Sequence, residues 1–393
     1  MGARTVGIYL GVIQFFFALS WTVYVIFLPQ LAAKVGIPKS AVIWVLMLDQ
    51  LIFVLADYAM GVASDRAVRV VGRLGRVVLA VTLLSCAAFL ALPLVAPSGS
   101  APLFLGIVVL WSVTSSALRA PPLTLIGRHA AKPQVPWLVG LSMLGLGVAS
   151  AISPYLSVLL RDLDPRGPFL LSSIALALAT WGIVAAERAL AGQPVAPAST
   201  KAPERQPQGT PAAIGFLMAA VLAAVAFQLH TFINSTPLYL RFAKPADLQW
   251  LAPVFWIGFN LAMLPASWAS KRFGGWQVMA VAGLAAALAS LWAHQATGLQ
   301  PLIAAQLMAG AAWAGLLMGA FSVALALGRT GREGRFGGAL SSVLALAALG
   351  RMAVLAAEWQ KDPSALPSLA WAPVVGWLLA GSVLFLLSRR RQT

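Results

Sequence analysis

The chain has 393 residues, of which 60% are hydrophobic and only 10% charged, and its formal net charge is +16 at pH 7. A soluble protein of this length needs far more polar surface, so the composition excludes a soluble globular protein and predicts an integral membrane protein. The single cysteine, Cys86, excludes an intrachain disulfide and a thiolate metal cluster.

Twelve apolar stretches are long enough to be membrane-spanning helices, since about 20 helical residues cross a hydrocarbon core about 30 Å thick. They are rich in Ala, Leu and Gly and lack the ten-residue alternation of barrel strands. In chain order they cover residues 6–31, 41–63, 77–96, 101–125, 137–160, 168–186, 212–236, 249–270, 276–293, 300–327, 336–357 and 367–387. The expected fold class is therefore all-α, in a polytopic membrane protein.

A segment rich in Pro, Ala and Gln, residues 188–211, separates the first six stretches from the last six. We expect an N-terminal half over 1–187, a cytoplasmic linker over 188–211 and a C-terminal half over 212–393. "GVASDRAVRVVGR" follows the second stretch, and "SWASKRFGG" follows the eighth, at the corresponding place in the second half. Internal repeats of this kind are typical of secondary transporters.

The basic residues are unevenly distributed between the two sides that these stretches define. With the N-terminus placed inside, most of the 27 Lys and Arg residues fall on the inner side, while Arg119 and Arg351 lie within the stretches. This asymmetry predicts both termini in the cytoplasm, and we expect the location to be a bacterial inner membrane. The net positive charge thus reflects topology, and we expect no nucleic-acid partner.

The most charged part of the chain follows the second stretch. "GVASDR" (61–66) and "VGRLGR" (71–76) resemble the loop between helices 2 and 3 of the major facilitator superfamily, and "LADYAMGVASDRAVRVVGR" is loosely similar to the glycoside–pentoside–hexuronide cation symporters. The matching positions are Asp57, Gly61, Asp65, Arg66, Gly72 and Arg73. Two positions depart from the pattern, because Tyr58 replaces a proline and Phe53 a second acidic residue. The resemblance implies two pseudo-symmetric six-helix bundles and transport by alternating access.

The same loop has the chemistry of a cytoplasmic latch between the halves. Gly61 permits close approach of another helix, and Asp65 can accept hydrogen bonds from the free N–H groups of a helix start. The segment "FGGALSS" (336–342) provides such a start on the same side. The expected gating residues are Gly61, Asp65, Arg66, Arg69, Gly72, Arg73 and Arg351. The alternative for the basic residues is that they serve topology alone.

Two acidic residues inside the second stretch are candidates for proton coupling, because an ionised carboxylate in hydrocarbon pairs, faces water or takes a proton. Asp57 and Arg119 lie at similar distances from the inner ends of their helices, which predicts an ion pair within the first half. The alternative is a permanent structural pair with no part in transport. The coupling residues expected are Asp57, Asp49 and Arg119.

Asp49 and Arg351 lie at similar depths near the outer side. In the superfamily the second and eleventh helices meet across the interface between halves, so a pair of these residues would form an outer gate. In the alternative, Asp49 faces an outer vestibule and Arg351 pairs with Glu358 or extends to the interface.

Few polar groups are available to bind a solute. The superfamily resemblance places helices 1, 4, 7 and 10 around the cavity, which contain most of the candidates. The expected substrate-binding residues are Gln14, His230, Asn234, Asn260, Gln306, Trp256 and Trp313. A buried, hydrogen-bonded histidine and lipid-facing tryptophans are the alternatives.

These features together predict a monomeric secondary active transporter that moves a small solute and is coupled to protons or another cation. The three histidines lie apart and no phosphate-binding loop or nucleophile with a base is found, so we expect no metal, no cofactor and no enzyme activity. The alternative from another class is a non-transporting assembly factor or receptor that keeps the transporter fold.

Overall fold

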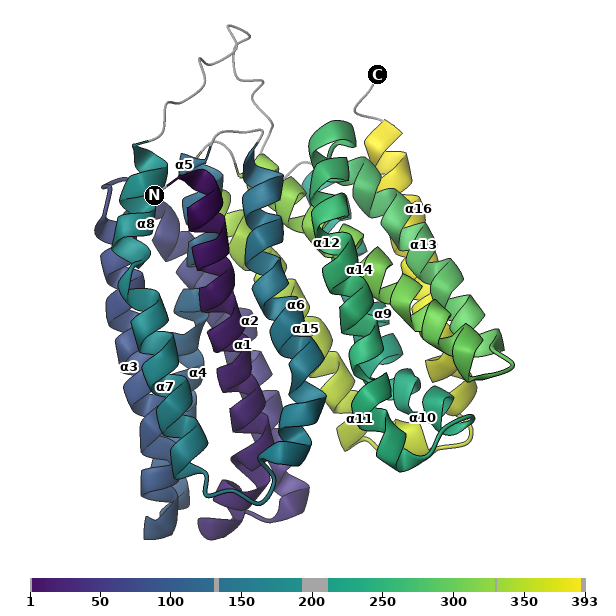
Figure 1. Ribbon diagram of the computed structural model, residues 1–393, viewed down its shortest axis with the longest axis horizontal. Helices are drawn as coiled ribbons and strands as arrows, with labels where there is room; N and C mark the ends of the chain where they lie inside the picture. The colour runs from purple at the N-terminus through teal and green to yellow at the C-terminus, as the bar shows by residue number, and fades with distance from the viewer. Residues whose placement is uncertain (1, 131–133, 193–210, 329–330, 390–393) are drawn as a thin grey trace, which may run out of the picture.

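The computed structural model describes residues 2–130, 134–192, 211–328 and 331–389. Within these ranges every regular element is helical, and twelve helical segments are long and apolar enough to cross a membrane. The expected all-α polytopic fold is thus confirmed. The first helix begins and the last helix ends at the same end of the bundle (Figure 1), which we call the termini end; the opposite end is the far end.

The first six spans form one helical unit, which we call the N-unit. Its helices are α1 (Ala3–Lys34), α2 (Val42–Ala67), α3 (Arg73–Val95), α4 (Ala101–Ser115), α5 (Pro121–His129), α6 (Val135–Leu159), α7 (Arg166–Trp181) and α8 (Ile183–Ala191). The fourth span consists of α4 and α5, and the sixth of α7 and α8. The expected linker, 188–211, begins within α8, and its residues 193–210 lie outside the described ranges.

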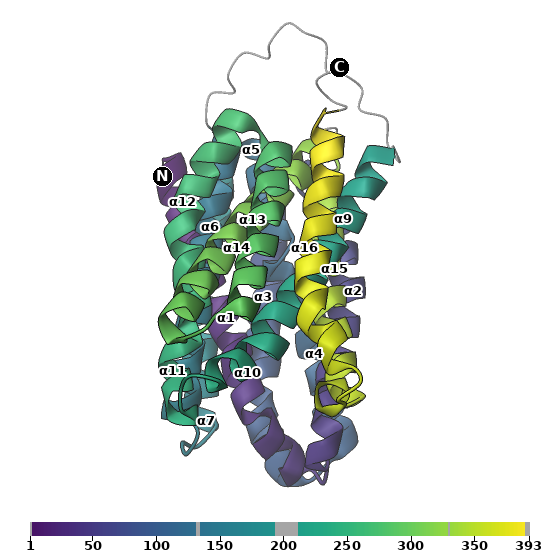
Figure 2. The same cartoon turned by 90° about the vertical axis from the view of Figure 1, so that its right-hand side faces the viewer.

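The last six spans form the C-unit. Its longer helices are α9 (Pro211–Leu229), α12 (Pro253–Phe273), α13 (Gly275–Gln295), α14 (Leu299–Leu327), α15 (Glu333–Ala356) and α16 (Leu366–Arg389). The seventh span continues from α9 through a π-helical turn, His230–Asn234, into the short α10 (Ser235–Leu240). The short α11 (Leu248–Leu251) precedes α12. Figure 2 shows α9 and α16 beside each other along the C-unit, and the two helices are in contact.

The two units meet mainly where α2 packs against α15 and α6 against α12. At the termini end of the first contact, a Cβ built on Gly61 would lie 2.9 Å from the Cα of Gly338. Gly334 and Gly338, four residues apart on α15, both face α2 at this point. Small residues at this spacing let two helices approach at backbone distance.

The link from α2 to α3 depends on Gly72, which has a left-handed backbone (φ 79°) immediately before the first residue of α3. A side chain is disfavoured in this conformation, so glycine suits the position. The expected latch residues Arg66, Arg69 and Arg73 surround this turn, and all three are exposed.

Candidate functional site

An ion pair lies inside the N-unit, between α2 and the break in the fourth span. The Nε atom of Arg119 is 3.1 Å from Oδ2 of Asp57, whose side chain is fully buried, whereas 23% of the Arg119 side chain is exposed. The guanidinium carbon of Arg119 also lies 4.5 Å from the centre of the Phe53 ring, one turn before Asp57 on α2. The structure therefore brings together the two residues that their depths predict to pair.

Prolines explain why Arg119 lies at a break. After α4, a short 3-10 turn covers Ser116–Leu118, and α5 then begins with Pro121 and Pro122. Proline has no N–H, so Pro122 cannot donate to the Leu118 carbonyl as a residue at that position of an α-helix does. The side chain of Gln14 replaces that donor, because its Nε2 donates to the Leu118 oxygen at 2.7 Å.

The same arrangement recurs in the C-unit. Pro373 lies within α16 and leaves the carbonyl of Leu369 without its helical donor. The Nδ2 atom of Asn234, in the π-helical turn, donates to that oxygen at 2.9 Å. Two side chains expected to bind a solute are thus engaged with carbonyls that prolines leave free.

The other polar candidates are also bonded within the C-unit. His230 is buried, with Nε2 3.0 Å from Oε1 of Gln306 and Nδ1 3.1 Å from Oγ of Ser290. Since an amide oxygen only accepts, Nε2 carries the proton and Nδ1 accepts from the Ser290 hydroxyl. Asn260 donates to the Trp256 carbonyl one turn earlier in α12, at 2.8 Å.

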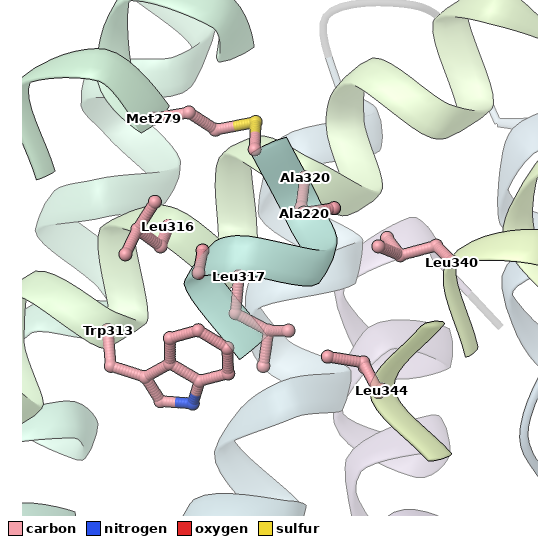
Figure 3. Close-up of a pocket in the computed structure, with 9 residues that line it drawn as sticks. Ala220, Met279, Trp313, Leu316, Leu317, Ala320, Leu340 and Leu344 are labelled. Carbon is pink, nitrogen blue, oxygen red and sulfur yellow. The ribbon is translucent and has the colours of Figure 1, made fainter. Parts of the chain in front are cut away.

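The two tryptophans belong to an aromatic group centred on Phe227 of α9. The ring of Trp313 stacks on Phe227 with centroids 4.2 Å apart, and Trp256 meets Phe227 edge-on at 5.8 Å. Trp313 also lines a small cavity between α9, α13, α14 and α15, whose other lining side chains are apolar (Figure 3). A polar solute finds no hydrogen-bonding partner among the aliphatic side chains there.

Asp49 and Arg351 do not form the expected ion pair in this structure. Both oxygens of the buried Asp49 accept hydrogen bonds inside the N-unit, from the Tyr24 hydroxyl at 2.7 Å and the Ser112 hydroxyl at 2.6 Å. The guanidinium of Arg351 lies instead over the ring of Phe232, 4.5 Å from its centre. The alternative partner, Glu358, pairs with Lys361.

The expected contact at the termini end is present. Oδ1 of Asp65 accepts from the backbone N–H of Gly334 at 2.6 Å, and Oδ2 accepts from that of Arg335 at 2.9 Å. These N–H groups lie in the first turn of α15, where they have no helical acceptor. The carboxylate of the N-unit thus holds the start of a C-unit helix.

A second carboxylate of this kind was not predicted from the sequence. Oε2 of the fully buried Glu187 accepts from the backbone N–H of Gly75 at 2.7 Å, in the first turn of α3. Glu187 lies at the end of an apolar stretch without a recognisable motif, so no sequence signal identifies its partner. The hydroxyl partners of Asp49 and His230 carry no charge and were missed for the same reason.

The described residues include no group of three or more His, Cys, Asp and Glu side chains that could hold a metal ion.

Comparison with known proteins adds a family and a fold. A family model described as Major Facilitator Superfamily matches residues 10–350. No curated protein matches the chain at a significant level.

Among solved structures, a bacterial homologue of the iron transporter ferroportin in its outward-facing state has a TM-score of 0.74 at 12% identity, over 98% of this chain and 100% of that one. The fucose:proton symporter FucP of E. coli has a TM-score of 0.65 at 13% identity, over 100% and 99%. The human organic anion transporter MFSD10 has a TM-score of 0.68 at 14% identity, over 98% of each chain. At these identities the likeness is one of fold.

Proposed function

Because the chain belongs to the major facilitator superfamily, we propose that it is a proton-coupled secondary transporter that moves a small solute across a bacterial inner membrane by alternating access. The observation that carries this proposal is the Asp57–Arg119 ion pair at the break in the fourth span. Asp57 is fully buried, whereas 23% of the Arg119 side chain is not covered by protein, and in the proposed mechanism this part of Arg119 faces the water-filled path between the units.

Protonation offers a direct way to couple this pair to transport. When Asp57 takes a proton, the attraction that holds Arg119 is lost, and an arginine in an apolar interior needs another partner or water. Arg119 lies at the break in the fourth span and not within a continuous helix. A movement of Arg119 therefore need not break the backbone hydrogen bonds of a helix. One fold neighbour is a fucose:proton symporter, which supports protons as the coupling ion. The loose similarity around Asp57 to the glycoside–pentoside–hexuronide symporters supports coupling at this position.

The contacts between units support alternating access. Asp65 and the glycines of α2 and α15 hold the units together at the termini end. This end would be the cytoplasmic one, as the distribution of basic residues predicts, and the conformation would then be closed to the cytoplasm. A fold neighbour is in an outward-facing state, which agrees with that assignment. We propose that the protein functions as a monomer, with one pathway between its two units.

The coupling role is tested by replacing Asp57 with asparagine, which imitates the protonated carboxyl but cannot release a proton. Purified protein is placed in vesicles with an inside-alkaline pH gradient, and accumulation of radiolabelled sugars, carboxylic acids and amines is measured. We expect gradient-driven accumulation of a transported solute to be lost in Asp57→Asn while solute exchange persists. Loss of both activities with a lower unfolding temperature would instead make Asp57 a structural partner of Arg119.

A reporter cysteine separates a transporter from a non-transporting receptor or assembly factor. Leu325 of α14 is buried at the termini end, beside Gly127 of α5. In a Cys86→Ser background, Leu325→Cys should react slowly with a membrane-impermeant maleimide, and faster when the termini end opens. The alternative, a non-transporting receptor or assembly factor, would be favoured by two results together. The maleimide reactivity of the cysteine would not change with pH or added solute, and the protein would neither accumulate nor exchange any of the solutes.

A further inference from the structure

Arg351 is a basic side chain within a span that has no carboxylate partner among the described residues. Arg351 takes part in neither of the ion pairs described above, Arg119–Asp57 and Lys361–Glu358. The Nε atom of Arg351 is buried and has no hydrogen-bond acceptor. A cation in the interior of a membrane protein is costly unless it is paired, so an unpaired one indicates a functional site.

The surroundings of Arg351 are aromatic. Its guanidinium lies over Phe232, in the π-helical turn of the seventh span. The Phe232 ring meets Phe227 edge-on at 5.7 Å, and Phe227 stacks on Trp313. A cation–π contact stabilises a cation by much less than the cost of removing that cation from water. The ring therefore orients the guanidinium but does not replace a counter-ion.

The distribution of acidic residues indicates which charge this region accepts. In the described C-unit they are Asp247, Glu333, Glu358 and Asp362, and each lies at a helix end or in a connection between helices. No carboxylate of the described C-unit thus lies at the depth of Phe232, whereas Arg351 does. A cationic solute would find no opposite charge on this side, and an anionic one would find a guanidinium with free donors.

We propose that the transported solute is an organic anion, whose carboxylate or phosphate binds Arg351 and whose apolar body lies against Phe232. An arginine presents paired donors that match either group in a bidentate manner. Other protein atoms leave 44% of the Phe232 surface uncovered, and the body of the solute would lie against this apolar surface. The inference rests on the proposed transport function and names its substrate class.

The test uses three probes that share one ring. Benzoate and phenyl phosphate carry the anionic groups, and benzamide is the uncharged isostere of benzoate. Each is titrated into purified full-length protein, and the unfolding temperature and tryptophan fluorescence are recorded. We compare the wild type with Arg351→Gln, with Arg351→Lys, and with Arg161→Gln, which removes an exposed arginine of the α6–α7 connection.

We expect at least one anion to stabilise the wild type and Arg161→Gln, and benzamide to do so much less. Arg351→Gln should weaken anion binding by about ten- to a hundredfold, since a hydrogen bond to a charged group contributes about 1.5–3 kcal/mol. Arg351→Lys, which keeps the charge and loses the paired donors, should show an intermediate affinity. If Arg351→Gln does not fold, the affinity of Arg351→Lys for the anions still tests the proposal.

Equal binding of benzamide and benzoate, or anion affinity unchanged in Arg351→Gln and Arg351→Lys, would overturn the proposal. So would a failure of both anions to stabilise the wild type, which would mean that Arg351 finds its counter-ion within the protein when the far end closes. None of these outcomes tests alternating access. That proposal is tested separately, because the reporter cysteine Leu325→Cys measures opening of the termini end without any solute.

Discussion

Replacing Gln14 with leucine tests whether one side chain compensates for a proline in another helix. Leucine is of similar size and removes the donor to the Leu118 carbonyl, which Pro122 leaves without a helical partner. In water-soluble proteins a buried, unsatisfied carbonyl costs about 1–3 kcal/mol. In membrane proteins the measured values are smaller, averaging about 0.6 and reaching about 1.7 kcal/mol, because the unfolded chain also finds partners.

We therefore expect Gln14→Leu to lower the free energy of unfolding by about 0.6–1.7 kcal/mol. The decisive comparison is made in a Pro122→Ala background, where residue 122 regains an N–H that can reach the Leu118 carbonyl. There the cost of Gln14→Leu should fall close to zero, so that the double-mutant cycle shows a coupling of about the same size.

The measurement is reversible unfolding of the four purified proteins in mixed detergent, followed by tryptophan fluorescence. Gln14→Glu is a useful further variant, because a carboxylate oxygen facing the carbonyl replaces attraction with repulsion. If Gln14→Leu costs the same with Pro122 and with alanine at that position, the side chain does not act through the free carbonyl, and the account of the break is wrong.

Three further outcomes follow from the contacts between and within the units. Asp65→Asn should raise the maleimide reactivity of the reporter cysteine at the termini end, because one of two charge-assisted hydrogen bonds is lost; unchanged labelling would refute the latch. Gly61→Val should separate α2 from α15 and raise the same reactivity severalfold, whereas Ala63→Val, at an exposed position two residues further along α2, should not, and equal effects of the two would contradict the close approach. Tyr24→Phe removes a donor to the buried Asp49 carboxylate and should lower the unfolding temperature at pH 8 more than at pH 5, since the ionised form depends more on its donors; a loss independent of pH would show that Asp49 stays in one protonation state.

The contacts of a side chain are predicted best from the sequence where its depth in the membrane or a sequence motif indicates the partner. Asp57 and Arg119 are charges at matched depths in two helices of one unit, and the structure contains their contact; their role in coupling stays a prediction. The spacing of Gly61 and Asp65 likewise predicts a helix start as partner, which the structure contains at Gly334. Both cases involve an aspartate, and the chain has only 11 Asp and Glu residues, so few combinations are possible.

The partner of a polar side chain is harder to predict from the sequence where uncharged groups, such as hydroxyls and backbone carbonyls, can also bind it. The matched depths of Asp49 and Arg351 allow an ion pair as one of two alternatives, but hydroxyl groups from α1 and α4 occupy both oxygens of Asp49. Gln14 and Asn234 are predicted to bind a solute because few polar groups lie in the spans and because the resemblance places helices 1 and 7 around the cavity. The prolines that engage them lie in other helices, and pairing a particular amide with a particular free carbonyl requires the packing of the spans.

The contact of Asp65 has a consequence for how this protein can change over evolution. The donors of its hydrogen bonds are main-chain N–H groups, which every residue except proline carries at position 335. Substitution of the Arg335 side chain therefore leaves the hydrogen bond in place, and no compensating exchange at that position can restore a lost carboxylate. Homologous sequences should accordingly show little covariation between positions 65 and 335. The constraint should appear instead as a demand for small residues at 61, 334 and 338, where α2 and α15 approach each other most closely.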